Sequence, residues 1–149
     1  TVNMTYKDFD FSIFGQGSGG NKIFQGLRRL DILTANYSAD ALNRWTGPGT
    51  SNTYPRLTDS DTNRNFTKPS DFYLEDGTFF RIKTVQLGYN VPQQFIQKMS
   101  LSQLRLYVTV NNLATFTKYS GYDPEISGSI DRGIYPQART YMFGLNISF

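Results

Sequence analysis

The sequence contains no cysteine and no histidine. Without cysteine there are no disulfide bonds and no cysteine-ligated zinc, although this absence does not fix the compartment. Without histidine the Ser-His and Cys-His catalytic pairs and the histidine-based metal motifs are excluded as well. We therefore predict a protein that is not an enzyme, with no catalytic residue, no cofactor and no metal ligand.

Long apolar runs and clusters of charge are also missing. No apolar run approaches the roughly 20 residues that a transmembrane helix needs. The chain has 15 Lys and Arg against 12 Asp and Glu, a net charge of +3, and its cations are scattered rather than gathered in a stripe. This pattern indicates a solvated surface and no nucleic-acid partner.

The chain is rich in aromatic residues instead, with 12 Phe and 10 Tyr among 149 residues and a hydrophobic content of only 38%. This combination is typical of a β protein with an aromatic girdle, whose membrane strands need about 9–11 residues, half of them apolar. The sequence begins at Thr1 without a leader, so we expect it to be a piece of a longer protein.

The clearest pattern lies in residues 140–149, where every odd position is large and apolar and the even positions are small or polar apart from Met142. Such alternation predicts a strand with one apolar and one mostly polar face. Both a barrel wall between lipid and water and a strand of a soluble sandwich fit the pattern. The barrel is favoured because the sequence stops on the last aromatic residue. The apolar members are Tyr141, Phe143, Leu145, Ile147 and Phe149.

Similar alternation predicts further strands earlier in the chain. They form a hairpin over residues 1–17 with a tight turn at Lys7-Asp8, a strand over 78–91 and a strand over 103–117. In the last of these, the polar face carries Arg105, Tyr107 and Asn111.

The strand over 78–91 is irregular because Arg81 and Lys83 fall on its apolar face. Two interpretations are open. Either both cations lie near lipid head groups, where charge costs little, or a bulge reverses the register.

The connections differ in length. The turn over 92–102 is short, with one helical turn in QQFIQKM, whereas the loops over 18–77 and 118–139 are long and polar. Short turns on one side and long loops on the other are the arrangement of outer-membrane barrels. Within the longer loop, SADALNRWTGP predicts a short helix with Ser38 as its N-cap and Gly47-Pro48 as its stop.

Three stretches resemble the C-terminal end of the SusC/RagA group of TonB-dependent outer-membrane transporters of Bacteroidetes. They are DFYLEDGTFFRIKTVQLGYNVP, LRLYVTVNNLATFTKYSGYDPEIS and YPQARTYMFGLNISF, while GNKIFQ and RWTGPGT…YPRL look like the long loop before them. The resemblance covers essentially the whole chain, with the order and spacing of the stretches in agreement.

The resemblance implies an all-β fold: an antiparallel transmembrane β-barrel section, about the last five strands of a 22-stranded barrel with long extracellular loops. Strand 140–149 closes the barrel, the turn 92–102 is periplasmic and the loops 18–77 and 118–139 are extracellular. Arg105, Tyr107 and Asn111 then face the lumen. The plug and the TonB box of the family are absent from this chain and are expected upstream.

The family also implies a function and partners. Its members import glycan oligomers or peptides through the bacterial outer membrane, with a SusD-like lipoprotein as lid and with energy from the TonB complex. Outer-membrane lipid surrounds the barrel. The closing strand resembles the signal that the barrel-assembly machinery reads. An unpaired edge strand with a strong apolar face is a good template to which the machinery can add a strand. That signal comprises Tyr141, Phe143, Leu145, Ile147 and Phe149.

Three motifs suggest other chemistry on weaker grounds. GQGSGG at 15–20 matches a dinucleotide fingerprint but lacks a βαβ unit, so the start of a flexible loop is favoured. DSDTN at 59–63 resembles a calcium loop, but Arg64 and Ser70 stand where Gly and Glu belong, so a polar loop is favoured and an irregular ion site using Asp59 and Asp61 is the alternative. The carboxylates of Asp123-Pro124-Glu125 could suggest glycosidase chemistry, but Pro124 marks a turn.

The long loops carry residues that can contact a sugar, a peptide or the lid. They can equally pin their own loops. The candidates are Trp45, Tyr119, Tyr122, Asp123 and Tyr135. The alternative to a transporter is a free-standing soluble β-sandwich that binds carbohydrate, which explains the alternation and the loop aromatics but not the apolar end.

Overall fold

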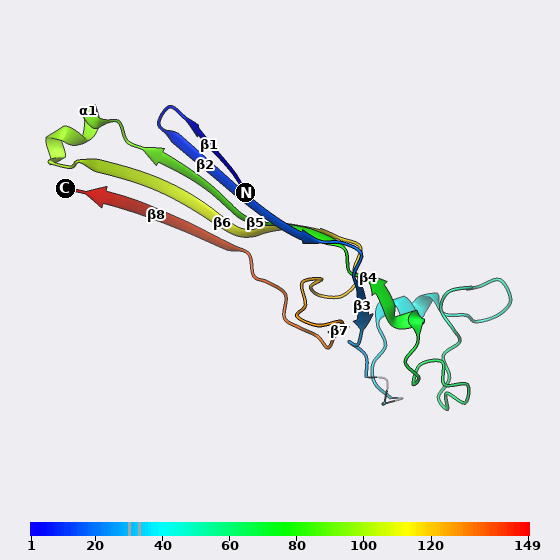
Figure 1. The fold of residues 1–149 in the computed structure, drawn as a ribbon. Coiled ribbons are helices and arrows are strands. Elements are labelled where there is room, and N and C mark those ends of the chain that lie inside the picture. The colour runs from blue at the N-terminus through cyan, green and yellow to red at the C-terminus, as the bar shows by residue number, and fades with distance from the viewer. Residues whose placement is uncertain (30, 33) are drawn as a thin grey trace. The chain divides into compact units, whose positions relative to one another are not determined.

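The computed structural model describes residues 1–29, 31–32 and 34–149 (Figure 1). Two compact units divide the chain. The first comprises Thr1–Gly20, Gly77–Lys118 and Pro136–Phe149, and the second comprises Asn21–Asp76 and Tyr119–Tyr135. Within the described ranges, no helix has the length and apolar character needed to cross a membrane.

The first unit is a five-stranded antiparallel sheet with the strand order β1-β2-β5-β6-β8 (Figure 1). The predicted all-β, antiparallel architecture is therefore confirmed. The second strand of the hairpin expected over residues 1–17 ends at Ser18. The strands are β1 (Val2–Tyr6), β2 (Phe9–Ser18), β5 (Phe79–Asn90), β6 (Gln103–Thr117) and β8 (Thr140–Ser148).

Two short connections join neighbouring strands. Between β1 and β2, Lys7 takes the left-handed conformation with φ 53°. Between β5 and β6 the chain forms the helical turn α1 (Gln93–Ile96) and the 3-10 turn η3 (Gln97–Met99), as QQFIQKM predicts. The side chain of Ile96 is 1% exposed and anchors this turn.

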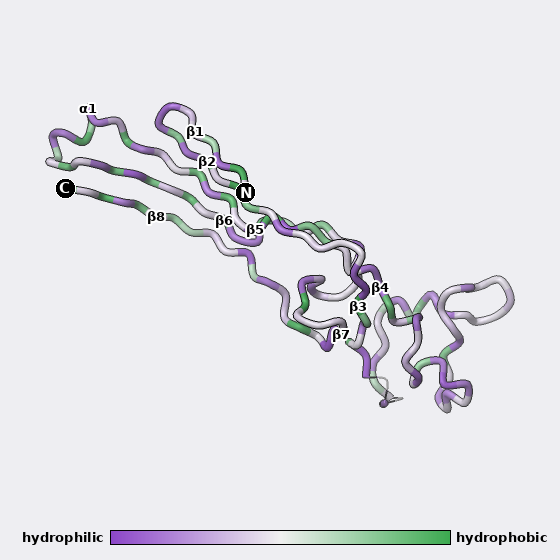
Figure 2. Tube along the Cα trace, viewed as in Figure 1, coloured by the Kyte–Doolittle hydropathy of each residue, from purple (hydrophilic) through white to green (hydrophobic). Residues whose placement is uncertain are grey.

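The register places apolar side chains in rows across the sheet. One row runs from Met4 through Phe11, Leu87 and Val108 to Phe143. Figure 2 shows the resulting alternation of hydrophilic and hydrophobic residues along the strands. The side chains of this apolar face remain exposed, 56% for Met4 and 82% for Phe143. A soluble sandwich would bury such a face against a second sheet, so the fold does not support that alternative.

A bulge changes the register of β5 around Lys83. Phe14 and Gly15 of β2 lie opposite Thr84 and Ile82, so Lys83 is an extra residue in β5. Arg81 thereby moves to the polar face, where its side chain is 3% exposed. Its Nε donates to Thr115 Oγ1 at 2.8 Å. Of the two interpretations open for Arg81, the structure shows the second: a bulge reverses the register.

An ion pair crosses the polar face of the sheet. Arg105 of β6 donates from Nε to Asp10 Oδ1 at 2.9 Å and from Nη2 to Asp10 Oδ2 at 2.5 Å. The pair passes directly over Gly88 of the intervening strand β5, where a Cβ atom would meet Arg105 Nη2 at 2.5 Å. Glycine is required at this position because the Asp10 and Arg105 side chains lie directly against the backbone of β5 and leave no space for a side chain.

A second glycine has the same role under an aromatic ring. The ring of Tyr107 lies over Gly144 of β8, where any Cβ atom would overlap the ring. The Arg105 guanidinium lies 5.1 Å from the centroid of the same ring. Further along this face, Thr84 Oγ1 lies 3.2 Å from Asn111 Oδ1. The polar face is therefore a connected layer of side chains.

The second unit contains a three-stranded sheet with the order β4-β3-β7. Its strands are β3 (Lys22–Gln25), β4 (Leu74–Asp76) and β7 (Ile130–Asp131). Strand β3 pairs antiparallel with β4 and parallel with β7. The stretches predicted as the loops 18–77 and 118–139 thus pair with each other and form a folded unit.

The helix predicted from SADALNRWTGP is shorter than expected. It is a 3-10 helix, η1 (Ala39–Asn43), and Ser38 makes no side-chain cap; its Oγ instead lies 3.4 Å from Asp40 Oδ2. Only Ala41 is buried, so there is no apolar face to support further turns. Trp45 then donates its backbone N–H to Tyr54 O at 2.9 Å, which draws the chain into a loop.

We predict that Gly88→Val destabilises the sheet, because the new side chain displaces the Asp10–Arg105 pair. Overpacking at such a site costs about 1–3 kcal/mol. The effect is measured as a lower midpoint of thermal unfolding, with the variant and the unaltered protein compared in full length. Gly19→Val is the matched control, since nothing lies within 4 Å of a Cβ at Gly19. Equal midpoints for the two variants would contradict the close approach at Gly88.

Candidate binding site

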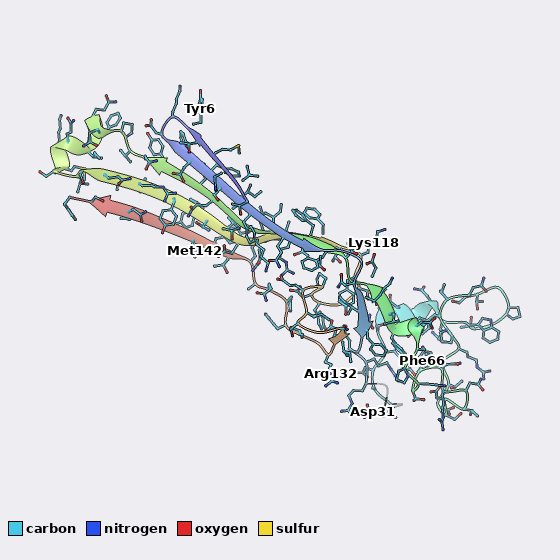
Figure 3. All side chains as sticks on the ribbon, in the orientation of Figure 1. Tyr6, Asp31, Phe66, Lys118, Arg132 and Met142 are labelled. Carbon is cyan, nitrogen blue, oxygen red and sulfur yellow. The ribbon has the colours of Figure 1, made fainter. Side chains whose placement is uncertain are left out.

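An aromatic cluster organises the second unit. Phe66 lies at its centre, 1% exposed (Figure 3). Its ring makes edge contacts with Tyr37 at 5.6 Å and with Phe72 at 6.3 Å, and a tilted contact with Tyr54 at 5.8 Å. Phe72 in turn contacts Tyr73 of the 3-10 turn η2 (Asp71–Tyr73) at 5.1 Å. These rings replace regular secondary structure as the core of the unit.

A cavity of about 400 Å³ opens beside this cluster. Its wall combines tyrosine rings with an arginine, two carboxylates and two amides. The size lies within the range of small-ligand sites, and a mixed aromatic and hydrogen-bonding wall is suited to a polar organic ligand such as a sugar or a peptide. The lining residues are Gln25, Leu27, Arg28, Asn36, Tyr37, Ser38, Asp40, Tyr54, Phe66, Phe72, Tyr73, Glu75, Ser120 and Tyr122.

Two lining groups already have structural partners. Glu75 accepts hydrogen bonds from Gln25 Nε2 at 2.9 Å, Ser120 Oγ at 2.7 Å and Ser120 N at 2.9 Å. Tyr73 donates its hydroxyl to Phe66 O at 2.9 Å, and burial raises the pKa of Tyr73 to about 12. Both groups hold the cavity wall in place.

Other lining groups are better placed for a ligand. The Arg28 guanidinium lies 4.0 Å from the centroid of the Tyr37 ring, which fixes a planar cation against an aromatic face. Asp40 is exposed, and so is Tyr122, at 67%. Together these residues offer stacking and hydrogen bonds, and they form no nucleophile-base pair.

The end of β7 is held by a buried carboxylate. Asp131, 0% exposed, accepts the Tyr119 hydroxyl at 2.7 Å on Oδ2 and the Gly133 N–H at 2.8 Å on Oδ1. Burial and the hydrogen bond to this carboxylate raise the pKa of Tyr119. Tyr119 remains a protonated donor at physiological pH and ties the loop to the sheet.

Asp61 organises the preceding loop in a similar way. Its Oδ2 accepts hydrogen bonds from Thr67 Oγ1 at 2.7 Å and from Thr67 N at 3.0 Å. Burial acts to raise the pKa of Asp61, but these bonds and those from the Phe66 and Asn65 amides outweigh it and hold the pKa below its ordinary value. The stabilisation is present above about pH 4 and is lost as the pH falls through the lowered pKa.

The chain has relatives of one kind along its whole length. It is 35% identical to TonB-dependent receptor P3 of Formosa agariphila over 99% of the chain and 16% of that protein. It is 28% identical to TonB-dependent receptor SusC of Bacteroides thetaiotaomicron over 100% of the chain and 14% of that protein. The chain thus belongs to the SusC/RagA group of TonB-dependent receptors.

Solved structures agree with this assignment. The RagAB peptide importer in its open-open state superposes with a TM-score of 0.78 and 25% identity, over 97% of this chain and 16% of that chain. No protein-family model matches the sequence. The chain spans about a sixth of the length of these relatives, which are receptors and transporters rather than enzymes.

The residues predicted as loop contacts of this receptor segment divide into two groups. Tyr122 and Tyr135 are exposed, 67% and 85%, and only Tyr122 lines the cavity. Tyr119 and Asp123 are buried, 6% and 2% exposed, which fits the alternative that such residues pin their own loops. Tyr119 pins its loop through Asp131, and Trp45, half-buried, lines a separate polar hollow.

The three motifs with other possible chemistry have structural roles. Asp123 Oδ1 accepts the Glu125 backbone N–H at 2.9 Å, so the Asp123-Pro124-Glu125 motif forms a turn with a buried first carboxylate. In DSDTN, the Asp61 carboxylate accepts a hydrogen bond from Thr67 and so closes its own loop. No three Asp or Glu residues gather into a metal-binding group in the described part of the chain.

Two of the four glycines of GQGSGG, Gly15 and Gly17, lie within strand β2, and Gly19 and Gly20 follow it. A Cβ at Gly15 would meet Phe80 Cζ at 2.7 Å, and one at Gly17 would meet Phe79 O at 2.6 Å. The flexible loop predicted here was therefore wrong at these positions, because β2 continues under the Phe80 ring. No helix follows, which excludes the dinucleotide fingerprint.

The residues of β8 lie where their alternation predicts. Phe143 and Leu145 belong to the exposed apolar face, at 82% and 59%, and Phe149 is 93% exposed. Arg105, Tyr107 and Asn111 lie on the opposite, polar face. Tyr141 and Ile147 complete the apolar set on β8.

Sequence reasoning missed most of the cavity. Of its lining residues only Tyr122 had been predicted as a ligand contact, whereas Arg28, Tyr37 and Tyr54 had not. The available signal was the presence of aromatic residues in the otherwise polar stretch 18–77. Seven occur there: Phe24, Tyr37, Trp45, Tyr54, Phe66, Phe72 and Tyr73.

We predict that Asp61→Asn opens the loop around Arg64, because an amide accepts the Thr67 and Phe66 hydrogen bonds less strongly than a carboxylate. Arg64 is exposed, so limited trypsin digestion should cleave after it several-fold faster in this variant. Asp59→Asn is the matched control, since Asp59 is exposed two residues away. Equal cleavage rates in both variants would show that the Asp61 bonds do not hold the loop.

Proposed function

We propose that this chain is the C-terminal part of the β-barrel of a SusC-like, TonB-dependent importer in the bacterial outer membrane. The observation that supports this most strongly is the exposed apolar face of the five-stranded sheet, backed by a polar face with a crossing ion pair. A sheet with these two faces suits a wall between lipid and an aqueous lumen.

The sheet edges support closure into a barrel. Among the residues that the structure describes, strands β1 and β8 each pair on one side only. In hydrocarbon, unpaired backbone N–H and C=O groups cost several kcal/mol each, so both edges need partner strands. About 17 further strands would complete a 22-stranded barrel, with β8 as the closing strand.

The polar face then borders the lumen. Arg105, Tyr107 and Asn111 project into it, and Asp10 neutralises the charge of Arg105 there. Such side chains can contact the plug or passing cargo.

The second unit then belongs to the extracellular side. Its aromatic cavity would contact cargo, and its surface would meet a SusD-like lipoprotein lid. Glycan oligomers or peptides fit the tyrosine, arginine and amide lining of the cavity. Energy would come from the TonB complex through a plug region outside this chain.

We predict that deleting Phe149 in the full-length protein lowers its amount in the outer membrane several-fold, because the terminal aromatic side chain is part of the assembly signal. Phe149→Tyr keeps the ring and should assemble normally. Quantitative immunoblotting of outer-membrane fractions measures both variants. Undiminished assembly of the deletion variant would refute the signal.

We also predict that Tyr122→Ala weakens cargo uptake while Tyr135→Ala does not. Both side chains are exposed, but only Tyr122 lines the cavity. Loss of one stacking contact raises the half-saturating concentration about two- to tenfold. Uptake of labelled glycan oligomers and peptides by cells that express each full-length variant measures the difference. Equal uptake by both variants would exclude the cavity as a cargo site.

A further inference from the structure

The alternation of side chains does not fully determine how the strands of the five-stranded sheet pair. A slip by one residue would exchange the two faces, whereas a slip by two residues keeps every side chain on its own face. On the apolar face of β8, such a slip would only exchange one large residue for another, because this face carries Tyr141, Phe143, Leu145 and Ile147. Another feature must therefore select the register that the structure shows.

Two glycines lie in one row on the polar face of the sheet. The register places Gly88 of β5 between Asp10 of β2 and Tyr107 of β6. Tyr107 in turn lies opposite Gly144 of β8. We call these four residues the glycine row. Each glycine is the only one in its strand, so a two-residue slip of either strand would bring a larger residue into the row.

The first glycine of the row lies beneath the Asp10–Arg105 ion pair. The carboxylate belongs to one neighbour of β5 and the guanidinium to the other, so the pair spans this strand. A two-residue slip of β5 would put the side chain of Gln86 or Asn90 in the place of Gly88. Either side chain would stand between the two charged groups, so the pair as observed is compatible with one register of β5.

The second glycine of the row lies beneath the Tyr107 ring. A two-residue slip of β8 would bring Met142 or Asn146 opposite Tyr107, and the side chain of either would displace the ring. The Arg105 guanidinium, 5.1 Å from the ring centroid, would lose its contact with the ring as well. An aromatic ring over a cross-strand glycine fixes the register of a sheet in this way.

The pairing of β2 with β5 repeats the arrangement on the apolar face. Phe80 of β5 lies over β2, where a Cβ at Gly15 would meet Phe80 Cζ at 2.7 Å and one at Gly17 would meet Phe80 Cδ2 at 3.3 Å. This contact lies on the other side of the Lys83 bulge from the glycine row. Each pairing from β2 to β8 thus has a large side chain that fits over a glycine.

We propose that Arg105 and Tyr107, lying over Gly88 and Gly144, are positioning residues that select the register in which β8 joins the sheet. The alternation determines which face each side chain occupies, and these two contacts determine which residues pair within that face. A slip by two residues would move a strand by about 7 Å. The inference concerns strand pairing within this chain, so it does not depend on the cargo or the partners of the proposed function.

Disulfide trapping between β6 and β8 in the full-length protein tests the proposal. Cysteines at Val108 and Phe143 should cross-link, because the two residues are paired and directly opposed Cα atoms lie about 4.5–5.5 Å apart. Cysteines at Val108 and Leu145, or at Val108 and Tyr141, report slips of two residues in the two directions. In the observed register these diagonal pairs lie about 7–8 Å apart, beyond the reach of a disulfide.

Removing the ring should allow β8 to slip. With Tyr107→Ala, the yield of the Val108–Phe143 cross-link should fall about twofold or more, and the yield of a diagonal cross-link should rise. Tyr107→Phe is the matched control, because it keeps the ring over Gly144, and it should cross-link as the unaltered protein does. An undiminished Val108–Phe143 cross-link with Tyr107→Ala, without a diagonal product, would overturn the proposal.

A reciprocal exchange decides the question if Tyr107→Ala does not assemble. The double variant Tyr107→Gly with Gly144→Tyr puts the ring on β8 and the glycine on β6, within the same row. Its yield of assembled protein with the Val108–Phe143 cross-link should exceed that of Gly144→Tyr alone several-fold, because Gly144→Tyr alone forces two rings into one place. A double variant that is no better than Gly144→Tyr would show that the ring and the glycine do not select the register.

Discussion

The cross-strand register of the five-stranded sheet is the constraint on which the rest of this structure depends. It aligns Leu87 with Val108 and Val108 with Phe143, so one face is apolar from edge to edge. The opposite face is held by the Asp10–Arg105 pair across Gly88. Because a one-residue slip would exchange the two faces, the register fixes which environment each side of the sheet can meet.

The sequence predicted the strands well because their alternation is a local property. The bulge at Lys83 could only be offered as one of two interpretations, since it depends on how β5 pairs with β2. GQGSGG was interpreted as the start of a flexible loop, although Gly15 and Gly17 lie inside the hairpin predicted over 1–17, because composition does not reveal that the Phe80 ring covers Gly15. Their strand conformation is a consequence of packing between strands.

The loop unit was the least predictable part. Its sheet joins Phe24 to Ile130, more than a hundred residues apart in sequence, and no local pattern indicates that pairing. The same holds for the inward turn of Tyr119 onto Asp131, which removed a predicted contact residue from the surface. Aromatic residues in polar loops therefore indicated a folded unit, while the choice between core and surface depended on distant partners.

The most direct test of the central claim is spin-label accessibility along β8 in the full-length protein in lipid. This segment has no cysteine of its own, so single cysteines at positions 142, 143, 145, 146 and 147 can carry the label, while Gly144 under the Tyr107 ring is left unchanged. The account predicts oxygen accessibility that is high at 143, 145 and 147 and low at 142 and 146, with a water-soluble relaxing agent showing the reverse. Accessibility without this two-residue period, or high water exposure on both faces, would contradict a membrane wall.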